Sequence, residues 1–285
     1  MRYKGRRQSS NIEDRRGMSS GAKIGIRGGI ASIVIAIIVI LLGGDPQTIL
    51  SLMQFGPEQT ETIEEYQPTA HEQELAEFVS VVLADTEDVW NILFNQMGLT
   101  YREPTLVLFS GQANSACGFS SAATGPFYCP GDERVYIDLL FLEQLQKKLG
   151  ANGDFAMAYI VAHEVGHHVQ QQFGLLNEMN SLRGKVSQEQ YNQLTVRLEL
   201  QADFYAGIWA HHAQKMKNIL DEGDIQEAMN AAQAVGDDRI QMKSQGYVVP
   251  DSFTHGTSAQ RMNWFKKGFL TGDINDGNTF DSDAI

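Results

Sequence analysis

One apolar stretch of the sequence contains three histidines and a glutamate, and this feature most restricts how the chain can fold. Residues 154–172 read DFAMAYIVAHEVGHHVQQQ, so the part before the first histidine has almost no polar face. This pattern predicts a buried helix that begins near Asp154, which can cap it, and ends before Gly174. A buried imidazole or carboxylate without a partner is destabilising, so these polar side chains require one.

The spacing of these side chains is that of a zinc motif, H-E-x-x-H. His163 and His167 lie four residues apart, which puts both imidazoles on one face of a helix, one turn from each other. There they can bind zinc at about 2.0–2.1 Å, while Glu164, roughly 100° around the helix, reaches the water that the metal activates. The alternative is that the histidines are hydrogen-bonded core residues and that Glu164 forms a salt bridge.

Two ligands are too few, because catalytic zinc usually takes three protein groups, so a third is expected from another helix. Ser187 and Gln190 form a capping-box pattern that predicts the start of that helix. On it, Glu199 could complete a His2Glu set, and Asp203 could accept the free N–H of either histidine. Small residues nearby would let the two helices approach closely: Ala202, Ala206 and Ala210. The alternative is a solvated acidic pair.

The remaining patterns predict an α+β fold that is mainly helical, with a small antiparallel sheet. Helical spacing marks four further segments: residues 71–98, 187–212, 224–233 and 258–269. Strand composition marks residues 105–110, and GPFYC and RVYID are expected to form a hairpin around PGDE.

The charge of the chain is distributed unevenly. Its formal net charge is −13, yet residues 1–27 hold eight Lys/Arg and two acids, while residues 28–285 hold fourteen and thirty-three. The acidic body argues against a nucleic-acid partner, and the basic head suits the cytoplasmic face of a membrane.

Seventeen uncharged residues, 28–44, follow the basic head. About 17 apolar residues is the lower limit for a membrane span, so we predict an uncleaved single-pass anchor. A cleaved signal sequence and a buried soluble helix are the alternatives. The expected organisation is a cytoplasmic head, an anchor, a tether, a metallopeptidase domain facing outward to the periplasm, and an acidic, frayed tail, with these bounds: 1–27, 28–44, 45–70, 71–273 and 274–285.

The only two cysteines, Cys117 and Cys129, are twelve residues apart. In an oxidising compartment they would close a short loop and stabilise the fold by about 3 kcal/mol. The alternative is two unpaired small hydrophobic residues.

Four segments in this order behind a basic head and one apolar run resemble the family of bacterial membrane-anchored proteins described as putative neutral zinc metallopeptidases. They are CGFSSAATGPFYCPGDERVYID, AHEVGHHVQ, ELQADFYAG and FTHGTSAQRMNWFKKGF, and the likeness extends to about Asp273. The resemblance implies a zincin-like fold and a gluzincin-like zinc metallopeptidase activity. It implies Zn2+ ligands at His163, His167 and Glu199, with Glu164 as the general base.

Two further roles are expected in such a peptidase. A donor usually stabilises the oxyanion, and His255 is our candidate, with Tyr205 or Arg261 as substitutes; His255 could instead only cap the helix that follows it. Zincins commonly hold a peptide along an exposed sheet edge, so Phe127 and Tyr128 could line the cleft. The alternative is that this hairpin, closed by the disulfide, has only a structural role and does not bind the substrate.

The sequence therefore predicts a membrane-anchored zinc endopeptidase that acts on proteins or peptides outside the cytoplasm. An exopeptidase with the same site is one alternative. A second is a metal-stabilised scaffold that binds envelope partners without cleaving them, although such a scaffold has no use for Glu164.

Overall fold

The computed structural model describes residues 1–17, 66–121, 125–140, 142–144 and 153–281. The predicted anchor, residues 28–44, lies outside the described residues, as does the predicted tether up to residue 65. Within the described ranges, every helix is too short or too polar to cross a bilayer. Residues 1–17 and the chain from Gln67 onward form one compact unit.

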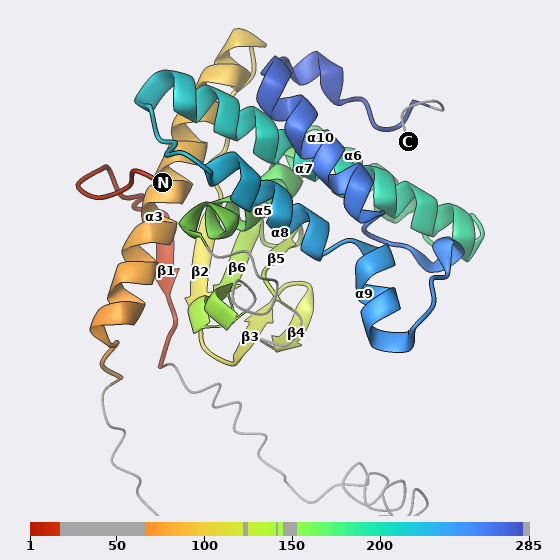
Figure 1. The fold of residues 1–285 in the computed structure, drawn as a ribbon, viewed down its shortest axis with the longest axis horizontal. Helices are drawn as coiled ribbons and strands as arrows, with labels where there is room; N and C mark the ends of the chain where they lie inside the picture. The colour runs from red at the N-terminus through yellow and green to blue at the C-terminus, as the bar shows by residue number, and fades with distance from the viewer. Residues whose placement is uncertain (18–65, 122–124, 141, 145–152, 282–285) are drawn as a thin grey trace, which may run out of the picture. The chain divides into compact units, whose positions relative to one another are not determined.

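A four-stranded sheet with the order β1-β2-β6-β5 lies at one side of this unit (Figure 1). Its strands are β1 (Ile12–Asp14), β2 (Thr105–Phe109), β6 (Arg134–Asp138) and β5 (Phe127–Cys129). The β5–β6 pair is antiparallel, as predicted from the hairpin pattern, but β2 runs parallel to both β6 and β1. The sheet is therefore mixed, and β5 is an edge strand.

The two faces of the sheet meet different neighbours, because successive side chains of a strand point to opposite faces. Leu106, Leu108 and Val135 pack into the main core with the helices. Val107 and Tyr136 face the other way, toward a smaller cluster beneath the hairpin of β3 (Gln112–Ser115) and β4 (Gly118–Ser121).

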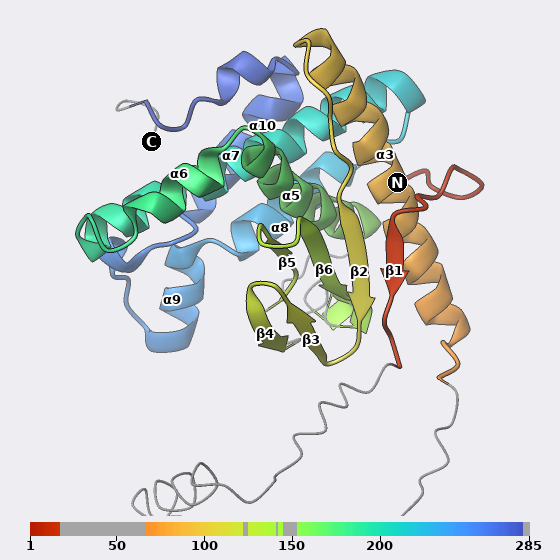
Figure 2. The same cartoon turned by 180° about the vertical axis from the view of Figure 1, so that it is seen from behind.

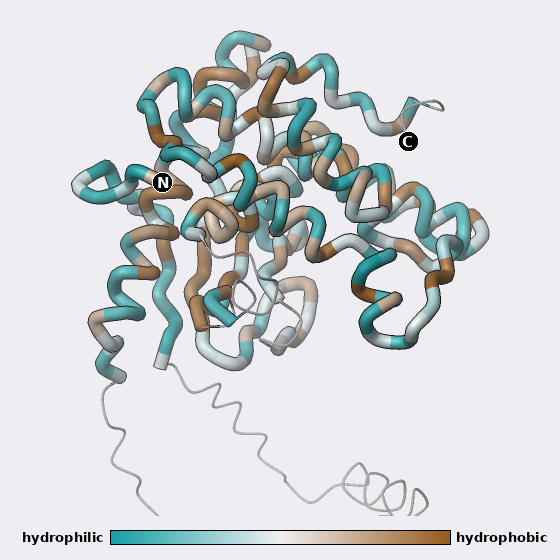
Figure 3. The backbone as a smooth tube through the Cα atoms, in the orientation of Figure 1, coloured by the Kyte–Doolittle hydropathy of each residue, from teal (hydrophilic) through white to brown (hydrophobic). Residues whose placement is uncertain are grey.

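Helices make up most of the unit, which confirms the predicted α+β class (Figures 1 and 2). They are α3 (Ala70–Gln96), α5 (Asp154–Gln172), α6 (Leu175–Leu182), α7 (Gln188–Lys217), α8 (Asp224–Ala234), α9 (Asp237–Gln245) and α10 (Ser258–Thr271), with the short 3-10 helices η2 (Pro250–Ser252) and η3 (Ile274–Gly277). Apolar stretches of α3, α5 and α7 meet in the main core, whereas α9 is largely hydrophilic (Figure 3).

The helix that carries the histidines has the predicted bounds, and α7 begins with the predicted capping box. The Ser187 hydroxyl accepts the Gln190 N–H, and the Gln190 side chain accepts the Ser187 N–H. In α5, Asp154 is the first helical residue and Gly153 occupies the N-cap position. The acidic side chain therefore lies in the first turn, where its negative charge interacts favourably with the positive end of the helix dipole.

Small residues bring α5 and α7 together, as expected from the alanines of α7. A Cβ atom added to Gly166 would lie 3.0 Å from the Ala202 carbonyl oxygen and 3.4 Å from the Ala202 Cβ. Such contacts are tighter than ordinary packing allows, so the two backbones approach at this point only because residue 166 has no side chain. The contact lies between the two histidines of α5 and next to Glu199 of α7.

Both ends of the predicted metallopeptidase domain extend further than residues 71–273. At the start, β1 from the basic head pairs with β2 and joins the sheet. At the end, residues 274–281, expected to be frayed, pack against α7: Arg197 donates to the carbonyls of Thr279 and Asp281, and Gln201 donates to the Gly277 carbonyl.

Candidate metal centre

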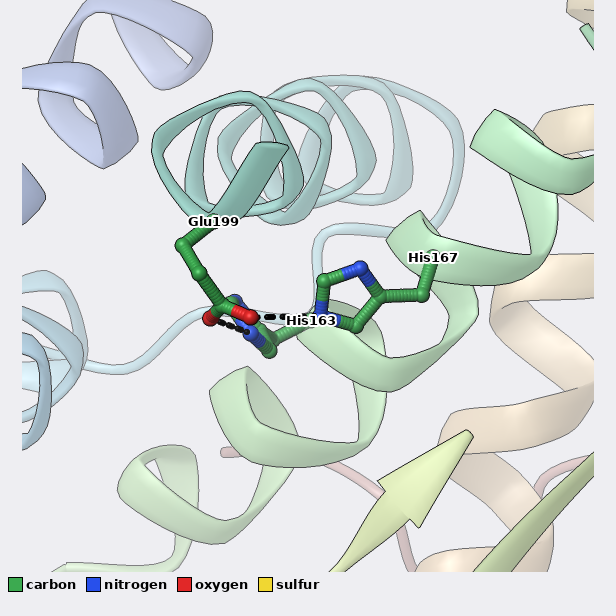
Figure 4. Close-up of side chains that lie close together, drawn as sticks. All are labelled: His163, His167 and Glu199. Carbon is green, nitrogen blue, oxygen red and sulfur yellow. Dashed lines mark ion pairs between the residues drawn. The ribbon is translucent and has the colours of Figure 1, made fainter. Parts of the chain in front are cut away.

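The helices α5 and α7 bring His163, His167 and Glu199 together, with the side chains pointing toward one another (Figure 4). His163 Nε2 lies 3.3 Å from one carboxylate oxygen of Glu199, and His167 Nε2 lies 3.5 Å from the other. The ligand atoms of all three residues fall within 4.8 Å of one another. Two imidazole nitrogens and a carboxylate therefore converge on one point.

The second nitrogen of each imidazole is engaged elsewhere, which leaves both Nε2 atoms directed at this point. His163 Nδ1 donates to Asp203 Oδ1 at 2.9 Å, the partner predicted for one of the two histidines. His167 Nδ1 donates to Gln170 Oε1, also at 2.9 Å. Gln170 is fully buried and is itself held by the Leu198 carbonyl. Such outer partners set the tautomer and orientation of metal-binding histidines.

A buried polar network surrounds Asp203. The Arg261 guanidinium donates to both of its carboxylate oxygens, at 2.8 and 3.0 Å, and the Tyr159 hydroxyl also donates to it. Arg261 is 3% exposed and Asp203 is fully buried. Arg261 thus contacts the carboxylate that orients His163, a role that the sequence did not suggest.

The electrostatics of the cluster follow from these contacts. Burial would lower the pKa of His163, but Asp203 and Glu199 outweigh it and raise that pKa to about 10. Burial would raise the pKa of Glu199, but His167 and His163 lower it below the ordinary range. Burial also opposes ionisation of Asp203, and the charges of Arg261 and His163 lower its pKa. The two carboxylates, Asp203 and Glu199, therefore favour a positive charge in the space between them.

The residues present fit a zinc ion. Nitrogen and carboxylate oxygen donors are those that zinc prefers, and three protein groups are the usual number at a catalytic site. The negative charge of Glu199 faces the two imidazoles. A divalent cation would satisfy all three side chains at once.

A cavity of about 470 Å³ opens beside these side chains, and its lining includes Glu164, His255, Arg261 and Tyr159. His255 Nδ1 donates to Asp237 Oδ1 at 3.2 Å. This hydrogen bond to Asp237 is the largest cause of the raised pKa of His255. His255 thus lines the same cavity as Glu164, with its ring held by Asp237. The helix after it is capped by Thr257, not by His255.

The three candidate oxyanion donors lie in different places. His255 and Arg261 line the cavity of about 470 Å³ beside His163 and His167, here called the metal-side cavity. The Arg261 side chain is already bound to Asp203. Tyr205 lines a separate cavity of about 400 Å³ formed mainly by α6, α7 and residues 274–280. Tyr205 therefore does not face the metal-side cavity. Asp237, which orients His255, was missed because it is one of many acids in an exposed-looking segment.

The edge strand β5 runs along this cavity, and both Phe127 and Tyr128 line it. Their rings point to opposite faces of the sheet. Phe127 stacks on Tyr136, and the Tyr128 hydroxyl lies 3.0 Å from Nδ1 of the buried His168. His168, to which the sequence assigned no role, thus anchors Tyr128.

A second cavity, of about 560 Å³, adjoins the first and is lined mainly by residues of α6 and of the first half of α7. The two share Tyr128, His167 and Glu199. The second is lined by Cys117, and the predicted disulfide joins Cys117 to Cys129 at the end of β5. The disulfide therefore ties the β3–β4 hairpin to β5 at the wall of a cavity that His167 and Glu199 also line.

Comparison with known proteins gives a consistent picture. A model of the family described as "Putative neutral zinc metallopeptidase" matches residues 1–280. The chain is 48% identical over 286 residues to the uncharacterized protein YpfJ of Escherichia coli (strain K12), covering 98% of this chain and 99% of that protein. It is 44% identical over 190 residues to the uncharacterized protein Rv2575 of Mycobacterium tuberculosis (strain H37Rv), covering 63% of each. No solved structure gives a significant match.

Proposed function

The chain belongs to the putative neutral zinc metallopeptidase family, and on this premise we propose that it is a zinc-dependent peptidase with Glu164 as its general base. The observation that carries the proposal is the convergence of His163, His167 and Glu199 from two helices. A zinc ion held by these side chains supplies Lewis-acid polarisation of the scissile carbonyl and of the attacking water.

The side chains of this chain carry the proton transfers. Glu164 follows the first histidine ligand on α5 and lines the cavity, where its carboxylate takes a proton from the attacking water. It then gives that proton to the amine that leaves. His255, held by Asp237, donates a hydrogen bond to the oxyanion that develops on the carbonyl. Arg261 acts one step further away, by holding Asp203 and through it the His163 ring.

We propose that the enzyme is an endopeptidase. Two cavities share Tyr128, His167 and Glu199 in their linings, and a substrate chain that occupied both would extend in two directions from the scissile bond. Within the described residues β5 is an edge strand, so its backbone could pair with an extended peptide, with Phe127 and Tyr128 at the cavities. A metal-stabilised scaffold is the alternative function, and the presence of Glu164 and His255 in the same cavity weighs against it.

Metal content tests the proposed ligand set. The purified protein is expected to hold about one zinc per chain, and His167→Ala or Glu199→Ala is expected to lose it, because two donors bind zinc much more weakly than three. His71→Ala, at an exposed histidine that pairs with Glu143 and is not part of the cluster, serves as the control and should retain zinc. Retention of a full equivalent in both ligand variants would contradict the assignment.

The pH profile tests the proposed role of His255. Because Asp237 raises the pKa of His255, the protonated donor persists to higher pH, and kcat should fall only as the pH rises through that raised pKa. Asp237→Asn removes the charge, so the alkaline limb of the kcat profile should move to lower pH. Asp251→Asn, an exposed control, should leave the limb in place. An unmoved limb in Asp237→Asn would exclude His255 as the titrating donor.

We also propose that the peptidase works outside the cytoplasm, attached to the cytoplasmic membrane through residues 28–44. The disulfide supports this compartment, because such bonds persist where the environment is oxidising. Protein or peptide substrates of the envelope are the expected partners, and the acidic body gives no reason to expect nucleic acid.

A further inference from the structure

The basic N-terminal segment, residues 1–17, neutralises carboxylates of α3. Arg7 Nη1 lies 3.0 Å from Glu87, and Arg7 Nη2 lies 2.7 Å from Asp88. Arg6 lies 2.5 Å from Asp85. Asp85 and Glu87 are each 1% exposed, so these are partners of buried charges rather than loose surface pairs. Basic residues that suggested a cytoplasmic topology signal therefore have a structural role in this domain.

Glu87 depends most on this segment. Besides Arg7, its carboxylate accepts hydrogen bonds from the Ser9 hydroxyl and the Asn11 side-chain amide. All of these donors come from residues 7–11. Without the segment, a carboxylate that is 1% exposed would lose its positive partner and both of these hydrogen bonds.

Backbone pairing joins the same segment to the sheet. Ile12–Asp14 form β1, which lies parallel to β2 with Ile12 opposite Leu106. The Leu106 N–H donates to the Asn11 carbonyl, and the Arg15 N–H donates to the Leu108 carbonyl. Glu13 in turn pairs with Arg134 of β6. Residues 1–17 thus complete the edge of the sheet whose other edge lies beside the metal centre.

We propose that residues 1–17 stay built into the metallopeptidase unit in the cell, so that they lie on the same side of the cytoplasmic membrane as the metal centre. A single crossing between Gly17 and Gln67 would put β1 and β2 in different compartments and leave Glu87 without these partners. The arrangement expected from the sequence, with the head inside and the domain outside, is therefore incompatible with this sheet.

Labelling of introduced cysteines tests this proposal on the full chain. Lys4→Cys marks the N-terminal segment, where the side chain is 76% exposed, and Leu270→Cys marks α10, where the residue is 64% exposed. Each variant is treated with a membrane-impermeant maleimide in intact spheroplasts and after lysis. The parent chain, whose two cysteines form the disulfide, gives the background.

We expect the two positions to behave alike, either both labelled before lysis or both labelled only after it. Labelling of one position in intact spheroplasts and of the other only after lysis would overturn the proposal. This readout requires no peptidase activity, so it is independent of the proposed catalytic function.

A second measurement tests the docking itself. Arg7→Glu reverses a charge that faces buried Glu87, so its Tm should fall by several degrees. Lys4→Glu makes the same change at a position whose ion pair with Glu74 is exposed on both sides, and its Tm should change much less. Equal melting of the two variants would contradict a structural role for the segment.

Discussion

Replacing Glu164 with glutamine is expected to lower kcat/KM for a peptide substrate by roughly 10³-fold, the middle of the range for loss of a general base. Glutamine has nearly the same shape but cannot take the proton of the attacking water. The three metal ligands remain, so zinc content should stay at the wild-type value. Glu164 lines the cavity and is 8% exposed, and glutamine nearly matches its size, so Tm should also stay near the wild-type value.

The measurement is cleavage of a casein or peptide substrate by zinc-loaded wild-type and variant protein, with metal content determined on the same samples. Glu189→Gln, on the exposed first turn of α7, is the matched control and should cleave like the wild type. Undiminished cleavage by Glu164→Gln would exclude this residue as the base. Absence of cleavage by a zinc-loaded wild type toward any protein substrate would favour the scaffold.

Replacing Arg261 with methionine is expected to give the largest loss of stability, about 3–5 kcal/mol in the free energy of unfolding. The reason is that Asp203 is fully buried and would keep its negative charge, while it would lose the guanidinium that donates to both of its carboxylate oxygens. The His163 ring is held by the same carboxylate, so zinc affinity should fall as well, by about 10- to 100-fold. Urea unfolding and a competitive zinc titration measure the two effects.

A double variant separates the loss of a partner from the loss of packing. Asp203→Asn combined with Arg261→Met removes both charges, so it should be less destabilised than the sum of the two single variants. Lys266→Met, on the exposed side of the same helix, should change stability little. If the single effects add in the double variant, the Arg261–Asp203 pair is not the source of the stability.

The convergence of His163, His167 and Glu199 was largely predictable from the sequence, because the parts of this cluster obey local rules. The i, i+4 spacing of His163 and His167 needs only a helix to put both rings on one face. The capping box at Ser187 set the start of α7, and from there the helix carried Glu199 and Asp203 to one side. Only the pairing of the two helices was non-local, and the small residues of α7 indicated it.

The outer parts of the site depend on contacts between segments far apart in the sequence. Asp237 meets His255 through the fold of η2 and the loop after it, and no local pattern marks that aspartate among its neighbours. Arg261 was considered only as an oxyanion donor, since its contact with Asp203 spans 58 residues.

The N-terminal strand was missed for a different reason. The strand β1 has three residues, which is too few for a periodic signal in the sequence. Its parallel partner β2 lies more than ninety residues further along the chain. The basic composition of the head also had a ready explanation in membrane topology. The structure instead pairs those charges with buried acids of α3, which sequence composition alone does not reveal.

Two neighbouring helices, α5 and α7, are expected to hold one zinc ion between His163, His167 and Glu199. Anomalous diffraction at the zinc edge from crystals of the purified protein tests it most directly. The account predicts one strong peak at about 2.0–2.2 Å from Nε2 of both histidines and from a carboxylate oxygen of Glu199. A zinc-saturated crystal whose peak lies away from these three side chains, or that has no peak among them, would contradict it.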